Sequence, residues 1–336
     1  MKGPIKYRPR DVVSLLCVAL ASWLALDASA AKDWRADTVP APGHVTAVET
    51  IGTDVYIAIG RRWYRIAAGA AGAARLESAP VPDRPAVPAG ALPDARVAVG
   101  VDKIARAWLA DPTSRYRHGV LGDAIEAGSL IIEHRDGRRG AILLGTDAVF
   151  EDIEPRIARI DGAERIFVVK SYLERGSALA IIDPDTAAIV AETPPIGHPN
   201  AWLNPAGIAD FNGDGATDIA LVRQPHVVGR LELWSFLNGK LQKTAEVPDV
   251  SNHVIGSRAL GMSATADFDG DGRLDLAIPS FDRRTLRLIA FTPHPRDIAR
   301  VSLPARVATN IGAIVFRDRL ALIVGLENGQ IILVHD

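Results

Sequence analysis

Short apolar runs separated by turn residues dominate the chain from about residue 44 to the C-terminus. Residues 55–59, 165–169 and 330–334 are such runs, rich in Val and Ile. Asp-Gly and Asn-Gly pairs, such as Asp136-Gly137 and Asn238-Gly239, lie between runs and favour hairpin turns. We find no sustained helical spacing of apolar residues with capping residues. The pattern predicts an all-β chain.

One sequence feature repeats along the chain. Residues 209–218 read ADFNGDGATD and residues 266–275 read ADFDGDGRLD. Residues 158–169 are a worn copy of the same unit. An interval of about 40–57 residues with four strands per unit is typical of a β-propeller, whose blades are four-stranded sheets.

The expected blade starts set the architecture. They lie near residues 44, 95, 120, 158, 206, 263 and 310. This spacing favours a single propeller of seven four-stranded blades, with six as the alternative. The last unit has three evident strands, so we expect residues 33–37 to supply its fourth, and the N- and C-terminal strands to close the propeller.

The two repeated segments place oxygen-bearing side chains at positions one, three, five and nine of a loop. In chain order these residues are Asp210, Asn212, Asp214 and Asp218, then Asp267, Asp269, Asp271 and Asp275. Position seven, Ala216 or Arg273, would offer a main-chain carbonyl. Ca2+ binds six to eight such oxygens. We therefore expect two calcium ions.

Two other interpretations of the loops are weaker. An EF-hand would need a Glu at position twelve, where Leu221 and Ile278 stand inside β-type runs. Asp-Gly pairs are also ordinary turn formers. Two nearly identical loops, each with four oxygen-bearing side chains, favour a cation over a bare turn.

At these residues the chain resembles the FG-GAP/VCBS-type repeat family, the calcium-loop propellers also seen in the head of integrin α subunits. Clear resemblance covers residues 206–222 and 263–280, although the family's Phe-Gly and Gly-Ala-Pro signatures are not intact. The resemblance implies Ca2+ in the hairpin between the first and second strands of a blade, held by the eight Asp and Asn side chains. The worn copy has Arg159 and Arg165 at acidic positions, so we expect no metal there.

The N-terminus has the pattern of an export signal. Four basic residues before position 11 precede an apolar run at residues 12–26, and Ala28-Ser29-Ala30 is a small-x-small cleavage pattern. We expect a signal peptide at 1–30, cleaved after Ala30, and a periplasmic or secreted propeller at 31–336. An uncleaved anchor is the alternative, but the run is shorter than the roughly 20 residues that cross a membrane.

Composition excludes several classes of protein. The 336 residues are 48% hydrophobic and 23% charged, with a formal net charge of −2. This balance gives no electrostatic footprint for nucleic acid or anionic membrane, and no later apolar run is long enough for stable membrane insertion. Cys17 is the single cysteine and lies in the export signal, so the exported chain would contain no disulfide.

Polar and aromatic residues gather in loops expected at the other end of the blades from the acidic loops. The candidate ligand-binding residues are His118, His198, Asn200, Trp202, Asn204, His226, His253 and Arg258. Converging loops of this kind favour a ligand site at the mouth of the channel. Hydrogen bonding to their own backbone is the alternative, and a transition metal held by His118, His198 and His253 is another.

These observations favour a calcium-stabilised module that binds a protein or glycan on the side away from the acidic loops. The alternative is a propeller-based hydrolase or lyase acting on a polysaccharide, with His198 or His253 as base and Asp123 or Glu126 as its partner. The chain has no nucleophile elbow, zinc-protease helix, phosphate loop or dinucleotide fingerprint. We therefore assign no catalytic residue.

Overall fold

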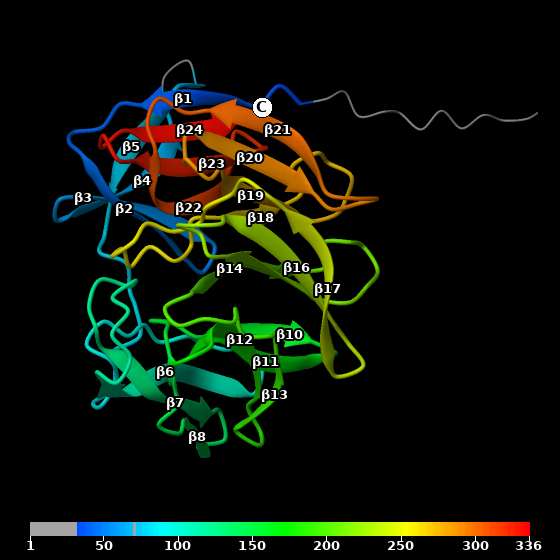
Figure 1. The fold of residues 1–336 in the computed structure, drawn as a ribbon. Coiled ribbons are helices and arrows are strands. Elements are labelled where there is room, and N and C mark those ends of the chain that lie inside the picture. Colours follow the sequence, from blue (N-terminus) through cyan, green and yellow to red (C-terminus); the bar gives the residue numbers. More distant parts are fainter. Residues whose placement is uncertain (1–31, 70–71) are drawn as a thin grey trace, which may run out of the picture. The chain divides into compact units, whose positions relative to one another are not determined.

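A computed structural model describes residues 32–69 and 72–336. These residues form twenty-four strands and no helix, which confirms the all-β prediction (Figure 1). Across this described part, no helix has the length and apolarity needed to cross a membrane. The expected signal peptide and its cleavage site lie outside the described residues.

Three sheets have four antiparallel strands that follow one another in chain order. The first holds β2 (Val45–Ile51), β3 (Asp54–Ile59), β4 (Arg62–Ala68) and β5 (Ala74–Ala79). Another holds β14 (Leu203–Ala209), β15 (Asp218–Arg223), β16 (Arg230–Leu237) and β17 (Lys240–Val247). The third holds β18 (Ala264–Ala266), β19 (Asp275–Pro279), β20 (Thr285–Ala290) and β21 (Arg296–Ser302).

The last sheet combines both ends of the described chain. Its order is β1-β24-β23-β22. The strands are β1 (Arg35–Val39), β22 (Val307–Phe316), β23 (Arg319–Leu326) and β24 (Ile331–His335). β1 pairs antiparallel with β24, with Arg35 opposite His335 and Val39 opposite Ile331. The N-terminal strand therefore supplies the fourth strand of this sheet, as the sequence predicted.

An eight-stranded sheet lies between residues 104 and 192. Its strands are β6 (Ile104–Thr113), β7 (Glu126–His134), β8 (Arg139–Leu143), β9 (Ala148–Phe150), β10 (Arg156–Ile160), β11 (Ala163–Tyr172), β12 (Gly176–Asp183) and β13 (Ala188–Glu192). It consists of two meanders, β6–β8 and β10–β13. Strand β9 joins them into one sheet, because it pairs with both β7 and β11. The chain is thus a propeller-like succession of antiparallel sheets.

The strand groups correct the preferred count of seven blades to six. The expected starts near residues 95 and 120 belong to one meander, because residues 80–103 contain no strand. Isolated bridges at Ala91 and Ala98 hold this segment along β6. Five prolines between residues 80 and 93 lack the N–H that a continuous ladder needs.

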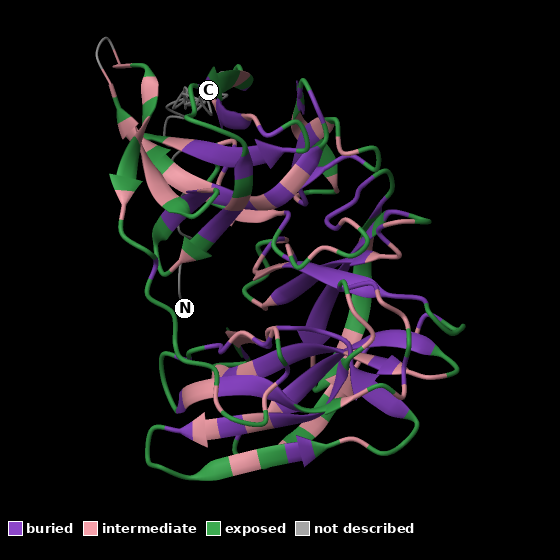
Figure 2. Ribbon diagram, turned by 90° about the vertical axis from the view of Figure 1, so that its left-hand side faces the viewer, coloured by how far each residue is buried: buried purple, intermediate pink, exposed green. Residues whose placement is uncertain are grey.

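The apolar core lies largely between neighbouring sheets. Leu288 of β20 and Val324 of β23 are fully buried in one cluster, and Val222 of β15 shares another with Ile278 of β19. In Figure 2 the buried strands are purple and the outer strands carry more pink and green. Side chains of facing sheets interdigitate in this way when sheets stack. This packing between sheets fixes the positions of the loops at the ends of their strands.

Charges link the first four-stranded sheet to the segment after it. Glu49 of β2, which is 8% exposed, accepts two bonds from Arg96 at 3.1 and 3.2 Å. Arg84 forms an ion pair with the same carboxylate at 2.9 Å. Within residues 32–69 and 72–336, no apolar cluster spans this sheet and the eight-stranded one. Removing one partner would leave a largely buried charge poorly compensated.

Strand β14 separates the two groups of candidate residues. Trp202 directly precedes it and Asp210 directly follows it. Seven residues of strand span about 23 Å. The acidic loop and the aromatic candidate therefore lie at opposite ends of one strand.

Candidate functional site

The first acidic loop joins β14 to β15, the first two strands of their sheet. Asp210 accepts bonds from two glycine N–H groups of the loop, at 2.7 and 2.9 Å. The Oδ1 atoms of Asn212 and Asp214 each accept a bond from the N–H two residues on. Asp218 is fully buried and accepts bonds from the Asn212 N–H at 3.3 Å and from the Ser235 hydroxyl. Burial raises the pKa of Asp218.

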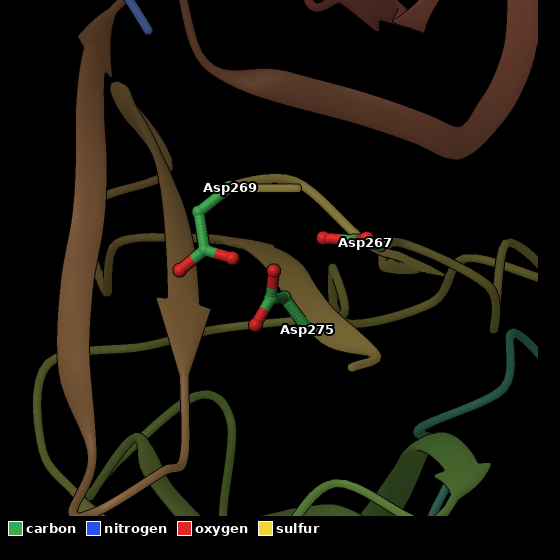
Figure 3. Close-up of side chains that lie close together, drawn as sticks. All are labelled: Asp267, Asp269 and Asp275. Carbon is green, nitrogen blue, oxygen red and sulfur yellow. The ribbon is translucent and has the colours of Figure 1, made fainter. Parts of the chain in front are cut away.

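The second acidic loop joins β18 to β19 and gathers three carboxylates. One side-chain oxygen from each of Asp267, Asp269 and Asp275 lies within 4.8 Å of the other two (Figure 3). Burial, together with the Asp269 carboxylate, raises the pKa of Asp275 to about 7. Arg296 donates to Asp269 at 3.1 Å, and Asp271 accepts the N–H of Arg273 at 2.9 Å.

Both loops have the donor set of a hard cation. Their side chains offer carboxylate and amide oxygens, with no thiolate or imidazole, which is the ligand type that calcium prefers. The loops are also neighbours, because the Arg273 side chain lies over Gly213 of the first loop. A Cβ added at Gly213 would lie 2.8 Å from Arg273 Nε, and Gly213 has φ of 74°. Glycine at this position therefore allows the contact without displacing the Arg273 side chain.

At the other end of β14, three side chains form a His–Trp cluster made of Trp202, His226 and His253. Trp202 and His226 lie parallel, with ring centroids 6.2 Å apart, and His253 lies 4.7 Å from Trp202. A 2.9 Å hydrogen bond joins His226 Nε2 to His253 Nδ1, and His253 Nε2 lies 2.9 Å from the Ser257 carbonyl. Both ring nitrogens of His253 are thus engaged.

Burial makes the two imidazoles neutral. It lowers the pKa of His226 to about 4 and that of His253 to about 3. The charge of Arg283 nearby adds to the lowering of each pKa. Near pH 7 the cluster therefore offers uncharged hydrogen-bonding groups.

A fully buried carboxylate orients His118. Its Nδ1–H donates to Glu151 Oε1 at 2.6 Å, while the Ser171 hydroxyl donates to Glu151 Oε2. The indole N–H of Trp202 donates to the Glu151 carbonyl at 3.2 Å, which joins this pair to the His–Trp cluster. Burial raises the pKa of Glu151, and His118 opposes that shift.

Glu126 is a second buried carboxyl group, close enough to Glu151 for the two to interact electrostatically. It is 1% exposed and its Oε1 has no hydrogen-bond partner. Burial, and then the Glu151 carboxylate, raise the pKa of Glu126 to about 10. Glu126 is therefore protonated at pH 7, and the neighbouring Glu151 carboxyl also has a raised pKa.

Two adjacent cavities open beside the cluster. The first has a volume of about 220 Å³ and is lined by His118, Val120, Asn200, Ala201, Trp202, Gln224, His226, Val227 and Ile255. The second has a volume of about 440 Å³ and is lined by Pro225, His226, Ser251, His253, Val254, Ile255, Phe281, Asp282, Arg283 and Arg306. His226 and Ile255 border both cavities, so the two lie side by side.

The structure brings together five of the eight predicted ligand-binding residues. His118, Asn200, Trp202, His226 and His253 line one of the two cavities. Trp202 is 2% exposed and forms the floor of the first cavity.

The other three predicted residues line neither cavity. Asn204 is fully buried and donates to the carbonyls of Asn252 and Leu260, so we remove it from the ligand-binding set. Arg258 forms ion pairs with two aspartates, one of them Asp123 at 2.9 Å. His198 is exposed and lies 3.3 Å from the Gln224 amide nitrogen.

The predicted base and carboxylate pairs do not form. Asp123 pairs with Arg258, and Glu126 has no histidine partner. The pair that exists is His118 with Glu151, and the sequence analysis missed Glu151 together with Gln224. Glu151 follows the three-residue strand β9, where no local pattern marks it.

The fold and the loops define a propeller-like all-β protein with acidic hairpins between the first two strands of a sheet. Residues 193–278 match the family model described as an FG-GAP-like repeat. This part of the chain is an FG-GAP-like repeat region, and the resemblance is confirmed over it. No curated protein matches the sequence.

Several solved structures are similar to this chain at low identity. BBS1N in complex with ARL6DN is 14% identical over 87% of this chain and 81% of its own, with a TM-score of 0.42. The rhamnogalacturonan lyase PL11 of Bacillus licheniformis is 15% identical over 83% and 57%, with a TM-score of 0.44. Rhamnogalacturonan lyase YesW is 14% identical over 88% and 67%, with a TM-score of 0.45. The chain thus spans little more than half of the PL11 lyase, and these likenesses carry no argument about function.

Proposed function

We propose that this protein is an exported glycan-binding module, with the glycan in the first cavity and calcium in the two acidic loops. The observation that carries the proposal is the lining of the first cavity. Its polar groups are the His226 imidazole, kept neutral by burial, the His118 ring and the amides of Asn200 and Gln224. Hydroxyl groups of a sugar fit such donors and acceptors, since each hydroxyl both donates and accepts.

The rim of this cavity adds apolar surface. Val227 is 75% exposed and Ile255 is 67% exposed, and both border the opening. Sugar rings present C–H faces beside their hydroxyl groups, so an apolar rim around neutral polar groups suits them. A peptide is the alternative occupant, and the experiment below distinguishes the two.

Backbone geometry supports a site that is formed in advance. Asn200 and Gln224 have φ of 56° and 48°, in the left-handed region that non-glycine residues rarely occupy. Such positions cost on the order of 1 kcal/mol and persist where the surroundings hold them. The Asn200 N–H donates to the Tyr116 hydroxyl at 3.0 Å, and three N–H groups of residues 227–229 donate to the Gln224 carbonyl.

Calcium would be held by the Asp and Asn side chains of the two loops and by the main-chain carbonyls of Ala216 and Arg273. A bound ion would neutralise carboxylates that otherwise repel one another, so its binding would couple to folding. The first loop lies at the far end of β14 from the cavity. We therefore assign the ions to stability, and binding to the cavity.

A glycan array probed with the exported chain in calcium tests the proposal. The strongest glycan is then titrated by calorimetry into the wild type and into Asn200→Gly and Gln224→Gly, which remove the side chain and suit a positive φ. Loss of one or two hydrogen bonds should weaken binding about tenfold. Asn238→Gly, with φ of 53° in the β16–β17 turn, is the matched control. Binding of peptides but no glycan, or full affinity in both cavity variants, would contradict the proposal.

A second candidate function rests on the His118–Glu151 pair. A buried carboxylate that fixes one imidazole nitrogen leaves the other, at the cavity wall, as a general base. This geometry supports the hydrolase or lyase alternative with His118 as base, in place of His198 or His253. Turnover of a polysaccharide is the direct test of this candidate.

A further inference from the structure

We propose that the second cavity binds the carboxylate of an acidic sugar, through Arg283 with Arg306 beside it. This inference rests on the proposed glycan-binding function and names its ligand class. The two cavities share the lining residues His226 and Ile255, so an oligosaccharide in the first cavity would extend toward the second.

Arg283 is a half-buried cation without an ion-pair partner. Its Nη1 donates to the Val307 carbonyl at 2.7 Å, and no carboxylate lies within ion-pair distance of it among the described residues. A guanidinium has five N–H donors and stays charged at any physiological pH. Burial lowers the pKa of Arg283, the Glu327 and Asp282 carboxylates oppose this shift, and the Arg306 charge adds to it.

The acidic groups near Arg283 are already engaged. Asp282 Oδ1 accepts bonds from the Ser280 hydroxyl at 2.6 Å and from the Arg284 N–H at 3.0 Å, and Ser280 lowers the pKa of Asp282. Glu327 pairs with Arg306 at 3.7 Å. The imidazoles of the cavity are neutral, so the two arginines are its cationic groups.

The backbone holds Arg283 in a strained conformation that a glycine would adopt more easily. Its φ is 59°, and its N–H and C=O bond to Ser280 and Val307 at 2.8 and 2.9 Å. The single side-chain hydrogen bond to the Val307 carbonyl does not offset the cost of placing an arginine at this positive φ. A fixed guanidinium with free N–H groups suits bidentate recognition of a planar carboxylate.

The experiment compares acidic oligosaccharides with their carboxyl-reduced forms, which have the same rings without the charge. We expect the wild type to bind a uronic-acid oligosaccharide at least tenfold more tightly than its reduced form, with a preference that declines as salt rises. Arg283→Gly should abolish this preference, and Arg283→Lys should retain part of it. Arg317→Gly, which removes the same charge at φ of 54° in the β22–β23 turn, should leave the preference unchanged.

Four outcomes overturn the inference. Equal binding of acidic and reduced forms, or an unchanged preference in a folded Arg283→Gly variant, removes the carboxylate subsite while glycan binding stands. Tighter binding of sulfated than of uronic sugars assigns the subsite to another anion. Absence of all glycan binding overturns the proposed function as well. Melting curves of each variant confirm that the fold is intact.

Discussion

The stability advantage of the Glu126→Gln variant over the wild type should grow as the pH rises. Burial beside Glu151 raises the pKa of Glu126 from its ordinary 4.5 to about 10 in the folded chain. Between these values the folded state holds a proton that the unfolded state releases. The stability associated with this proton is fully present below about pH 4.5 and is lost as the pH rises through the window.

The size of the effect follows from the linkage of one proton. The free energy of unfolding falls by about 1.4 kcal/mol per pH unit inside the window, or about 2.7 kcal/mol from pH 6 to pH 8. Gln does not titrate, so the advantage of Glu126→Gln over the wild type should grow by that amount. This free-energy difference requires only that the pKa of Glu126 is above 8 in the folded chain and ordinary in the unfolded chain.

Urea unfolding of residues 31–336 at pH 6, 7 and 8, in constant excess calcium, measures this difference. Glu133→Gln is the control on the same strand, because Arg106 and Arg139 lower the pKa of that half-buried carboxylate. The control variant should gain no advantage as the pH rises. A difference between Glu126→Gln and the wild type that stays flat from pH 6 to 8 would show that Glu126 is ionised, and would refute the electrostatics assigned to this site.

Two further outcomes follow from the acidic loops and from His118. EDTA should lower the melting temperature, since an ion at 100 times its Kd adds about 2.7 kcal/mol, and Asp275→Asn should reduce the bound calcium from two ions to one. An unchanged melting curve, together with no calcium in elemental analysis, would contradict the assignment of calcium to the two loops. Any polysaccharide turnover should disappear in His118→Gln and persist in His198→Gln, and turnover that survives His118→Gln would exclude His118 as the base.

Local patterns in the sequence predicted the features that depend on neighbouring residues. The acidic loops lie in hairpins between first and second strands because glycine turns and alternating oxygen side chains are local signals. β1 was predicted from the missing strand of the last sheet. These parts of the fold required no knowledge of distant contacts.

Features that depend on distant contacts were harder to predict. The preferred count of seven included a blade start near residue 95, but residues 80–103 contain no strand, and their prolines cannot donate to a ladder. Glu151 became visible only when the fold placed it under His118, 33 positions away. Asn204 looked accessible beside Trp202, but the direction of its side chain on β14 buries it.

A crystal structure of the exported chain with the strongest array glycan tests the central claim most directly. We expect the glycan over His226 and Gln224 in the first cavity, and calcium in both acidic loops at the far end of β14 and in the neighbouring hairpin. Glycan bound at a different surface, with the cavity beside the His–Trp cluster left free, would contradict the assignment of binding to this cavity.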